Sequence, residues 1–277
     1  MTNFVNPLEK PADEIVLNRY LSFLGINKNQ SPLKILETVI YSFSRLPYEN
    51  LTKIIKDDEE SSHAKARRLP NEVIEDHMQF GAGGTCFSLT ASLLHLIRAL
   101  GWRAEPILGD RRYGENTHCA LMVWVEDRPC LIDPGYLLLT PVEIPAKNPM
   151  LVKNLFNTVK LIPKDGDKVD LYTLENKKEV YRLTFKANPA DTAEFLKAWD
   201  SSFEWDMMNY PLLTRILNNE QIYLRGERLQ FRSSVNIRKQ ELRDSQICDE
   251  IVRLFHIDEK IVRRAVGVLK RKGASYG

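Results

Sequence analysis

Apolar residues in the first part of the chain recur at the spacing of amphipathic helices. This pattern predicts a helix over residues 12–24, which Gly25 ends, and a second helix over residues 32–44, which Ser31 caps. The polar stretch 56–68 interrupts the pattern with four consecutive acidic residues followed by two serines. Such a composition is typical of a solvated loop, so we expect a mobile connection there.

A largely apolar run over residues 86–100 follows the glycine-rich segment 81–85 and stops at Gly101. Leucine, isoleucine and phenylalanine recur in it at helical spacing, and a glycine directly after the run is typical of a helix C-terminus. The sequence therefore predicts a largely buried helix whose first residue is Cys86.

Short strand-like segments fill the middle of the chain. They are predicted at 104–108, 119–125, 130–132, 158–162, 168–174 and 180–185, and the polar turn 126–129 joins two of them as a hairpin. Helical periodicity then returns, with Asp191 capping a helix over 193–199, a strand pair near 221–224 and 229–231, and a helical run over 244–272 broken near 256–258. The expected fold class is α+β, with an N-terminal helical bundle (1–85), a central β-barrel or antiparallel sheet that includes the Cys86 helix (86–187), and a C-terminal α/β lid (188–277).

Composition narrows the class of protein. Of the 277 residues, 43% are apolar and 27% charged, which is ordinary for a globular protein. The 39 basic and 37 acidic residues are interspersed, which argues against a nucleic-acid partner, and the basic tail 260–272 reads as a solvated helix end. No signal peptide and no long apolar span is evident, so we expect a cytoplasmic protein without membrane contact. The four cysteines lack the spacing of a disulfide framework, so reduced thiols are expected.

The position of Cys86 gives its thiol unusual surroundings. Unpaired N–H groups and the positive dipole end at a helix N-terminus favour thiolate over thiol, and the same N–H groups can stabilise an oxyanion. Gly83 and Gly84 allow a sharp turn and leave room for a substrate. We therefore regard Cys86 as a candidate nucleophile, although free cysteines are also common as small buried apolar residues.

A thiol nucleophile needs a base, and the base needs an acid to orient it. Among the five histidines, His118 opens an apolar strand, and Asp133 ends the next apolar run. With the hairpin turn centred on residues 127 and 128, Asp133 falls opposite Met122, on the face of His118 but four residues away. A contact would require a bulge or a shifted register. Taken singly, His118 is also consistent with a satisfied polar residue at a strand end and Asp133 with a turn residue.

At these residues the chain resembles the arylamine N-acetyltransferase family, relatives of the transglutaminase and papain-like cysteine enzymes, and the resemblance implies a papain-like Cys-His-Asp core. The family's P-F-E-N-L element is matched by Pro47, Tyr48, Glu49, Asn50 and Leu51, and its R-G-G-x-C turn by Gly83, Gly84, Thr85 and Cys86. The strand histidine is matched by His118, and the D-V-G-F-G segment by Asp133, Gly135 and Tyr136. Order and separations agree over about the first half of the chain.

The resemblance implies a ping-pong acyl transfer from acetyl-coenzyme A to an arylamine or arylhydrazine, through a thioester on Cys86, with His118 as the base and Asp133 orienting it. Tyr48 and Tyr136 match aromatic positions near the acceptor pocket of the family. The residues that contact coenzyme A are not assigned, no metal is implied, and a monomer or homodimer is expected. A zinc site at Cys86, His118, Cys119 and Cys130 is disfavoured because no C-x-x-C pair is present.

The chain departs from the family pattern at several positions. Ala82 replaces an arginine, so Glu49 requires another cation, for which Arg67, Arg68 and Arg98 are candidates. The remaining departures are Ser88, Thr90, Pro134 and Leu137, the last of which replaces a glycine beside the cofactor. Two alternatives stay open: a thiol hydrolase or amide synthase with the same triad, and a non-catalytic binding homologue.

Overall fold

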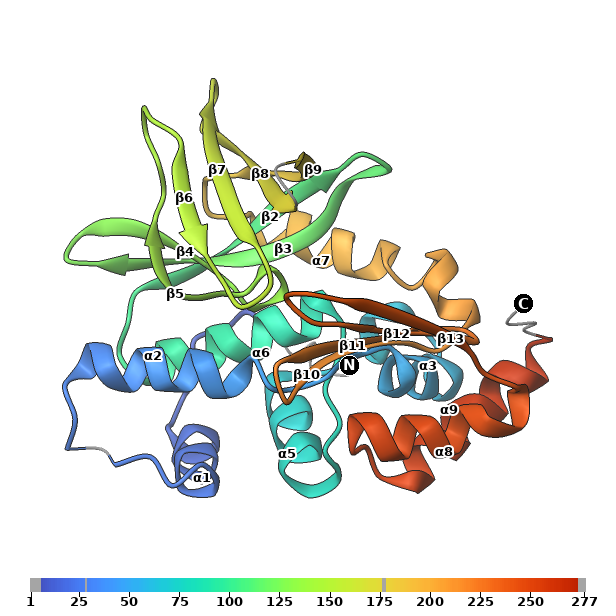
Figure 1. The fold of residues 1–277 in the computed structure, drawn as a ribbon. Coiled ribbons are helices and arrows are strands. Elements are labelled where there is room, and N and C mark those ends of the chain that lie inside the picture. The colour runs from blue at the N-terminus through green and yellow to red at the C-terminus, as the bar shows by residue number, and fades with distance from the viewer. Residues whose placement is uncertain (1–5, 28, 176–177, 274–277) are drawn as a thin grey trace. The chain divides into compact units, whose positions relative to one another are not determined.

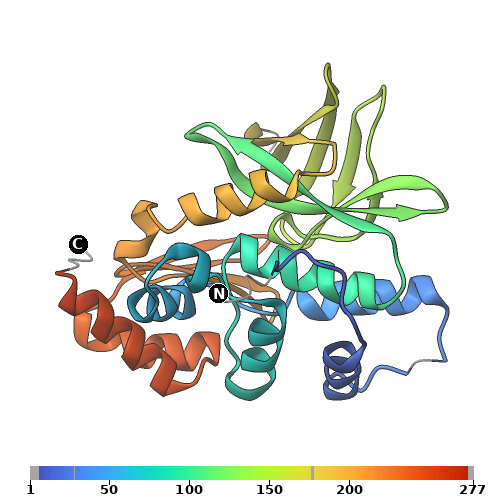
Figure 2. The same ribbon diagram turned by 180° about the vertical axis from the view of Figure 1, so that it is seen from behind.

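The computed structural model describes residues 6–27, 29–175 and 178–273, and the chain divides into two compact units (Figures 1 and 2). The first unit comprises Met1–Ser44 and Thr90–Ala198, and the second comprises Arg45–Leu89 and Trp199–Gly277. The fold class is α+β, as predicted: N-terminal helices, a nearly closed antiparallel barrel, and a C-terminal sheet with helices. Each unit thus contains one antiparallel sheet and is assembled from segments far apart in the sequence.

The sheet of the first unit has eight strands and curls into the barrel seen in Figure 1. Its spatial order is β5-β4-β3-β2-β9-β8-β7-β6, with every neighbouring pair antiparallel. The strands are β2 (Ala104–Arg111), β3 (Gly114–Val125), β4 (Arg128–Asp133), β5 (Leu138–Glu143), β6 (Met150–Lys153), β7 (Thr158–Lys164), β8 (Lys168–Glu175) and β9 (Lys178–Lys186). Alternate side chains, among them Ile107, Leu161 and Phe185, fill the interior. The six predicted strands are all present, and β5 and β6 were not predicted.

Helices α1 (Ile15–Phe23) and α2 (Pro32–Phe43) belong to the first unit, where α2 packs against β5 and the short 3-10 turn η1 (Pro134–Tyr136). Both lie where the periodicity predicts them. Helix α6 (Cys86–Ala99) begins in the second unit and continues in the first, whereas α7 (Thr192–Ser201) runs from the first into the second. Asp191 Oδ1 accepts the Ala193 N–H at 2.8 Å, which confirms the predicted cap of α7.

The turn between β3 and β4 fixes the position of Asp133. Val125 pairs with Arg128, so the turn residues are Glu126 and Asp127, with φ angles of 49° and 60°. Two consecutive positive φ angles are typical of the type I′ turn that suits the twist of a hairpin. The predicted turn centre was therefore wrong by one residue, and the register continues so that Asp133 falls level with Ala120 rather than Met122.

The second unit is built on a five-stranded antiparallel sheet with the order β1-β10-β11-β12-β13. The strands are β1 (Tyr48–Glu49), β10 (Leu212–Leu217), β11 (Glu220–Arg225), β12 (Arg228–Arg232) and β13 (Ile237–Glu241), and the other elements are α3 (Leu51–Glu59), α4 (His63–Ala66), α5 (Pro70–Phe80), η2 (Asp206–Asn209), α8 (Asp244–Phe255) and α9 (Glu259–Arg271). Side chains of α3, α8 and α9 form one apolar cluster with Leu213, Ile222 and Leu224 of the sheet. The predicted break in the last helical run is confirmed at His256, whose φ is 54°.

The expectation of a loop over residues 56–68 was wrong for most of that stretch, because α3 and α4 cover it. Ion pairs join the acidic end of α3 to the basic end of α9: Asp58 to Arg271 at 2.7 Å and Asp57 to Lys272 at 3.4 Å. The acidic run therefore meets the basic tail instead of solvent alone. No helix within the described residues combines the length and apolar character that a membrane crossing requires.

Glycine at position 127 is expected to stabilise the protein. Asp127 has φ 60°, a conformation that costs most L-residues roughly 1–2 kcal/mol and glycine little. Asp127→Gly should raise the free energy of unfolding in urea by about 0.5–1 kcal/mol, after allowing for the larger entropy of glycine in the unfolded chain. Asp165→Gly is the matched control, because Asp165 lies in the turn after β7 without a positive φ. A loss of stability in Asp127→Gly would contradict the turn assignment.

Candidate active site

The barrel of the first unit holds His118 and Asp133 in direct contact. His118 lies in β3 and Asp133 at the end of β4, and the two side chains are 4% and 2% exposed as residues. Nε2 of His118 lies 2.7 Å from Oδ2 of Asp133. The other carboxylate oxygen, Oδ1, accepts the Gly135 N–H at 2.9 Å. The backbone thus holds the carboxylate in place, and the carboxylate holds the imidazole.

Arg111 determines which nitrogen of His118 carries the hydrogen. Its Nη2 lies 3.1 Å from Nδ1 of His118. An arginine can only donate hydrogen bonds, so Nδ1 must accept and Nε2–H must donate to Asp133. The neutral imidazole therefore has its basic lone pair at Nδ1, where it accepts the Arg111 N–H, and this is the tautomer that a general base oriented by a carboxylate uses.

Aromatic rings surround this pair. The ring of Tyr136, directly after Gly135, meets His118 edge-on with the centroids 5.4 Å apart, and the ring of Phe185 in β9 lies 5.9 Å away. Burial raises the pKa of the Tyr136 hydroxyl, so this side chain stays neutral at ordinary pH. The first unit therefore unites three of the predicted site residues, His118, Asp133 and Tyr136.

Cys86 and Tyr48 belong to the second unit, where the glycine segment packs against β1. The Glu49 N–H donates to the Gly84 carbonyl at 2.9 Å, and the Gly84 N–H donates to Pro47 O at 3.3 Å. A Cβ at Gly83 would lie 1.8 Å from Pro47 O, so glycine is required here by the close approach of two backbones. Helix α6 begins three residues after Gly83, which places the half-buried Cys86 at the first helical position, as predicted.

The start of α6 is closed by Ser88, one of the departures from the family pattern. Its Oγ accepts the Thr85 N–H at 3.1 Å, and the Thr85 carbonyl accepts the Leu89 N–H at 2.9 Å. A Cβ at Gly84 would lie 2.4 Å from Ser88 Oγ, so this serine occupies the space beside the glycine. The short side chain of Ser88, the third residue of the helix, thus accepts a hydrogen bond from the backbone at the helix N-terminus.

Arg68 provides the cation that the buried Glu49 requires. Its Nη1 donates to Gly83 O at 2.5 Å and to Thr52 Oγ1 at 2.6 Å, and it lies 3.8 Å from Glu49 Oε1. Glu49 is fully buried and Arg68 is 5% exposed. Ala82 itself packs in the apolar cluster of the second unit, so a guanidinium reaches the same backbone from another element. Of the three candidate arginines, Arg68 is the one that pairs with Glu49.

Tyr48 and Asn50 tie the β1 segment to the C-terminal part of the second unit. The Tyr48 hydroxyl lies 3.7 Å from the sulfur of Met207. Asn50 Nδ2 donates to the carbonyls of Met207 and Tyr210, at 2.5 and 2.8 Å, while its Oδ1 accepts the Leu212 N–H at 2.9 Å. Asn50 therefore has a structural role, and Tyr48 stays the predicted substrate contact in this segment.

Two charged residues near the candidate site were not identified from the sequence. Arg111 lies on the neighbouring strand two residues beyond Gly109, which pairs with His118, so a correct reading of the β2–β3 hairpin could have placed Arg111 near His118. Lys53 lies in a stretch where every residue from 51 to 55 is buried. A lysine inside such a run was the available signal, because lysine is almost never fully buried without a partner.

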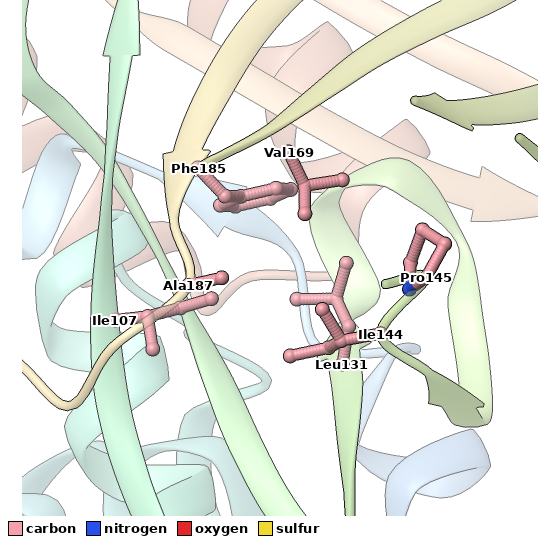
Figure 3. A pocket seen from close by; sticks show the side chains of 7 residues that line it. All are labelled: Ile107, Leu131, Ile144, Pro145, Val169, Phe185 and Ala187. Atoms are coloured by element: carbon pink, nitrogen blue, oxygen red, sulfur yellow. The ribbon is translucent and has the colours of Figure 1, made fainter. Parts of the chain in front are cut away.

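An apolar cavity lies inside the barrel, and its lining residues offer no group that could act in catalysis. The side chains that line it are Ile107, Leu131, Ile144, Pro145, Val169, Phe185 and Ala187 (Figure 3). None of them carries a polar side-chain group. This cavity is part of the barrel core, although the ring of Phe185 also contacts His118.

Removal of Arg68 should be costly because it leaves the Glu49 carboxylate buried without its cation. Arg68→Met is expected to lower the free energy of unfolding by about 3–5 kcal/mol, and a second change, Glu49→Gln, should recover part of the loss. Arg238→Met is the control, since Arg238 pairs with Glu220 at 3.1 Å on the surface and its loss should cost under about 1 kcal/mol. Equal losses of the free energy of unfolding in the two variants, measured by urea denaturation, would contradict a special role for Arg68.

Known proteins share both the sequence pattern and the fold of this chain. A family model described as N-acetyltransferase matches residues 33–261. The arylamine N-acetyltransferase from Mycobacterium abscessus is 18% identical, with a TM-score of 0.77 over 93% of this chain and 95% of that one. No curated protein sequence gives a significant match.

Two further solved structures share the fold. The arylamine N-acetyltransferase from Mycobacterium marinum in complex with CoA is 15% identical, with a TM-score of 0.72 over 92% of this chain and 98% of that one. One from Bacillus cereus, described as having a Cys-His-Glu catalytic triad, is 15% identical, with a TM-score of 0.71 over 88% and 99% of the two chains. These likenesses show the fold, and because the family model spans most of the sequence, the chain belongs to the arylamine N-acetyltransferase family.

Proposed function

We propose that this protein transfers an acetyl group from acetyl-coenzyme A to an arylamine or arylhydrazine, with Cys86 as nucleophile, His118 as base and Asp133 as the acid that orients the base. The observation that carries the proposal is the buried 2.7 Å contact between His118 Nε2 and Asp133 Oδ2, which leaves Nδ1 as the basic nitrogen. Family membership supports the reaction type, and the place of Cys86 at the start of α6 supports its role as the thiol.

The first half-reaction forms a thioester on Cys86. Nδ1 of His118 takes the proton of the thiol, and the sulfur attacks the acetyl carbonyl of the donor. The imidazolium that results is stabilised by the Asp133 carboxylate. Backbone N–H groups in the first turn of α6 stabilise the negative charge that develops on the carbonyl oxygen. The bond to the sulfur of coenzyme A then breaks, and coenzyme A leaves as a thiol with the proton from His118.

The second half-reaction passes the acetyl group to the amine. The amine nitrogen attacks the thioester, His118 accepts the proton that the nitrogen loses, and Cys86 leaves as the thiolate and regains a proton. We assign acceptor contacts to Tyr48 and Tyr136 by their match to the family pattern. The relative from Mycobacterium marinum was solved with CoA, which supports coenzyme A as the carrier of the acyl group.

Leu137 affects the space available to the acyl donor, acetyl-coenzyme A. This residue, which follows Tyr136 and stands where the family has glycine, has φ 59° and ψ 31°. The backbone here therefore keeps the left-handed conformation that glycine favours, while the position gains a half-buried isobutyl group. We infer that coenzyme A can still follow this backbone, with less space beside it than in relatives that carry glycine.

Acetylation of Cys86 should be directly visible. Incubation with acetyl-coenzyme A is expected to add one acetyl group, about 42 mass units by intact mass, to the wild-type chain and none to Cys86→Ala. Addition of an arylamine should discharge the adduct and yield the acetylated amine. Discharge by water at the same rate with or without amine would instead favour a hydrolase, and no adduct at neutral pH would favour a non-catalytic homologue and overturn the proposal.

The charge of Asp133 should matter more than its volume. Asp133→Asn is expected to lower kcat for arylamine acetylation by roughly 10³–10⁴-fold, because the imidazolium loses its counter-charge and the tautomer is no longer fixed. Asp170→Asn is the matched control, since Asp170 is another buried carboxylate of the barrel and accepts a hydrogen bond from Thr184 Oγ1 at 2.6 Å. Similar losses of kcat in both variants, with similar thermal midpoints, would argue against the assigned role.

A further inference from the structure

Lys53 is a buried amine in the second unit that the proposed reaction does not use. It lies in the first turn of α3 and is 3% exposed. Its Nζ donates to the Ser202 carbonyl at 2.7 Å and to Ser202 Oγ at 2.6 Å. The same nitrogen lies 4.1 Å from the centre of the Phe203 ring. The amine is therefore held at a defined position by groups that are all uncharged.

The surroundings of Nζ are those of an ammonium. The Ser202 hydroxyl donates its hydrogen to Trp199 O at 2.5 Å, so its oxygen can only accept from Lys53. A carbonyl likewise only accepts, and the face of an aromatic ring attracts a cation. Two acceptors and one ring face match the three N–H groups of a charged lysine, whereas a neutral amine would turn its lone pair toward the ring.

Aromatic rings connect this amine to the start of α6. Nζ of Lys53 lies 6.0 Å from the centre of the Trp205 ring, and the Phe87 ring lies 6.1 Å from the same tryptophan ring. Phe87 directly follows Cys86 and also stacks on Trp199 at 6.1 Å. Lys53 Nζ and the ring of the residue that follows Cys86 therefore lie against the same tryptophan ring, and a charge interaction in such apolar surroundings is stronger than in water.

Several ionisable groups influence the pKa of Lys53. Burial lowers its pKa to about 7, and negative charge on Cys86 opposes this more than Asp57 of α3 or Asp200 of α7 does. Each of these carboxylates has a cation of its own: Asp200 pairs with Arg67 at 2.5 Å and Asp57 with Lys272 at 3.4 Å. His63 of α4 stacks on the Phe203 ring, with the centroids 4.9 Å apart.

We propose that Lys53 is a positioning residue for the nucleophile: its buried ammonium, held by Ser202 and Phe203, favours the thiolate form of Cys86. In the net step the thiol proton passes from Sγ to Nδ1 of His118 while Nζ keeps its own proton, so a neutral thiol and imidazole become a thiolate and an imidazolium beside the Lys53 ammonium. The inference rests on the proposed function for its catalytic use, in which Cys86 would attack the donor as a preformed thiolate. Below the pKa of Lys53 the ammonium is present, and its effect on the thiol fades as rising pH removes that proton.

The pH profile of thiol alkylation tests this role without acetyl-coenzyme A. Iodoacetamide labelling of Cys86, followed by peptide mass between pH 5 and 9, should be about tenfold or more slower at pH 6 in Lys53→Met than in the wild type. At pH 9 the rates should converge, because an opposite charge nearby shifts a thiol by roughly 1–3 pKa units. Lys53→Arg should keep the fast rate at pH 6. Lys65→Met, which removes an exposed lysine of α4, should match the wild type.

A second measurement applies even where Lys53→Met does not fold. The coupling is reciprocal, so loss of the thiolate must lower the pKa of Lys53. NMR titration of the Lys53 ε-carbon should therefore give a lower midpoint in Cys86→Ala than in the wild type. Equal midpoints, or a Lys53→Met profile slowed alike at every pH, would overturn the inference. A Cys86 that reacts as expected here yet takes no acetyl group would instead count against the proposed function alone.

Discussion

The close approach of two backbones, at Gly83 and Gly84 on one side and Pro47 to Glu49 on the other, is the constraint on which the second unit depends. A single Cβ at Gly83 would collide with the Pro47 carbonyl, so no other residue fits without separation of the segments. The hydrogen bonds between them fix where α6 starts. The position of Cys86 at the first helical residue follows from this contact.

The buried carboxylate of Glu49 beside that contact is compensated by the buried guanidinium of Arg68. Arg68, which lies between α4 and α5, bridges the Gly83 carbonyl, Thr52 and Glu49, whereas the family pattern has an arginine next to the glycines. The packing of Ala82 in the apolar cluster shows why the cation had to come from elsewhere. Alanine at position 82 is therefore compatible with a stable site, because Arg68 supplies the cation that the buried Glu49 carboxylate requires.

The first unit aligns the imidazole of His118 with the carboxylate of Asp133. A rigid barrel carries His118 on β3, and the end of β4 supplies Asp133, whose second oxygen is held by the Gly135 backbone. Arg111 on the adjacent strand β2 can only donate hydrogen bonds. Its contact with Nδ1 of His118 therefore selects the tautomer in which Nε2 carries the hydrogen. Because all three groups belong to neighbouring strands of one sheet, small motions elsewhere leave their geometry unchanged.

The sequence by itself determined the elements with strong periodicity, the helix that begins at Cys86 and the family, because spacing, glycine positions and short motifs are local properties. It misplaced the hairpin turn by one residue, since Glu126 and Asp127 adopt positive φ angles without the glycine or asparagine that usually marks them. It also treated residues 56–68 as a loop, because the basic partners of the acidic run lie over 200 positions away. Only the tertiary structure decided that Arg68 pairs with Glu49, that Arg111 meets His118 and that Lys53 is buried, because these depend on contacts between elements that no local pattern encodes.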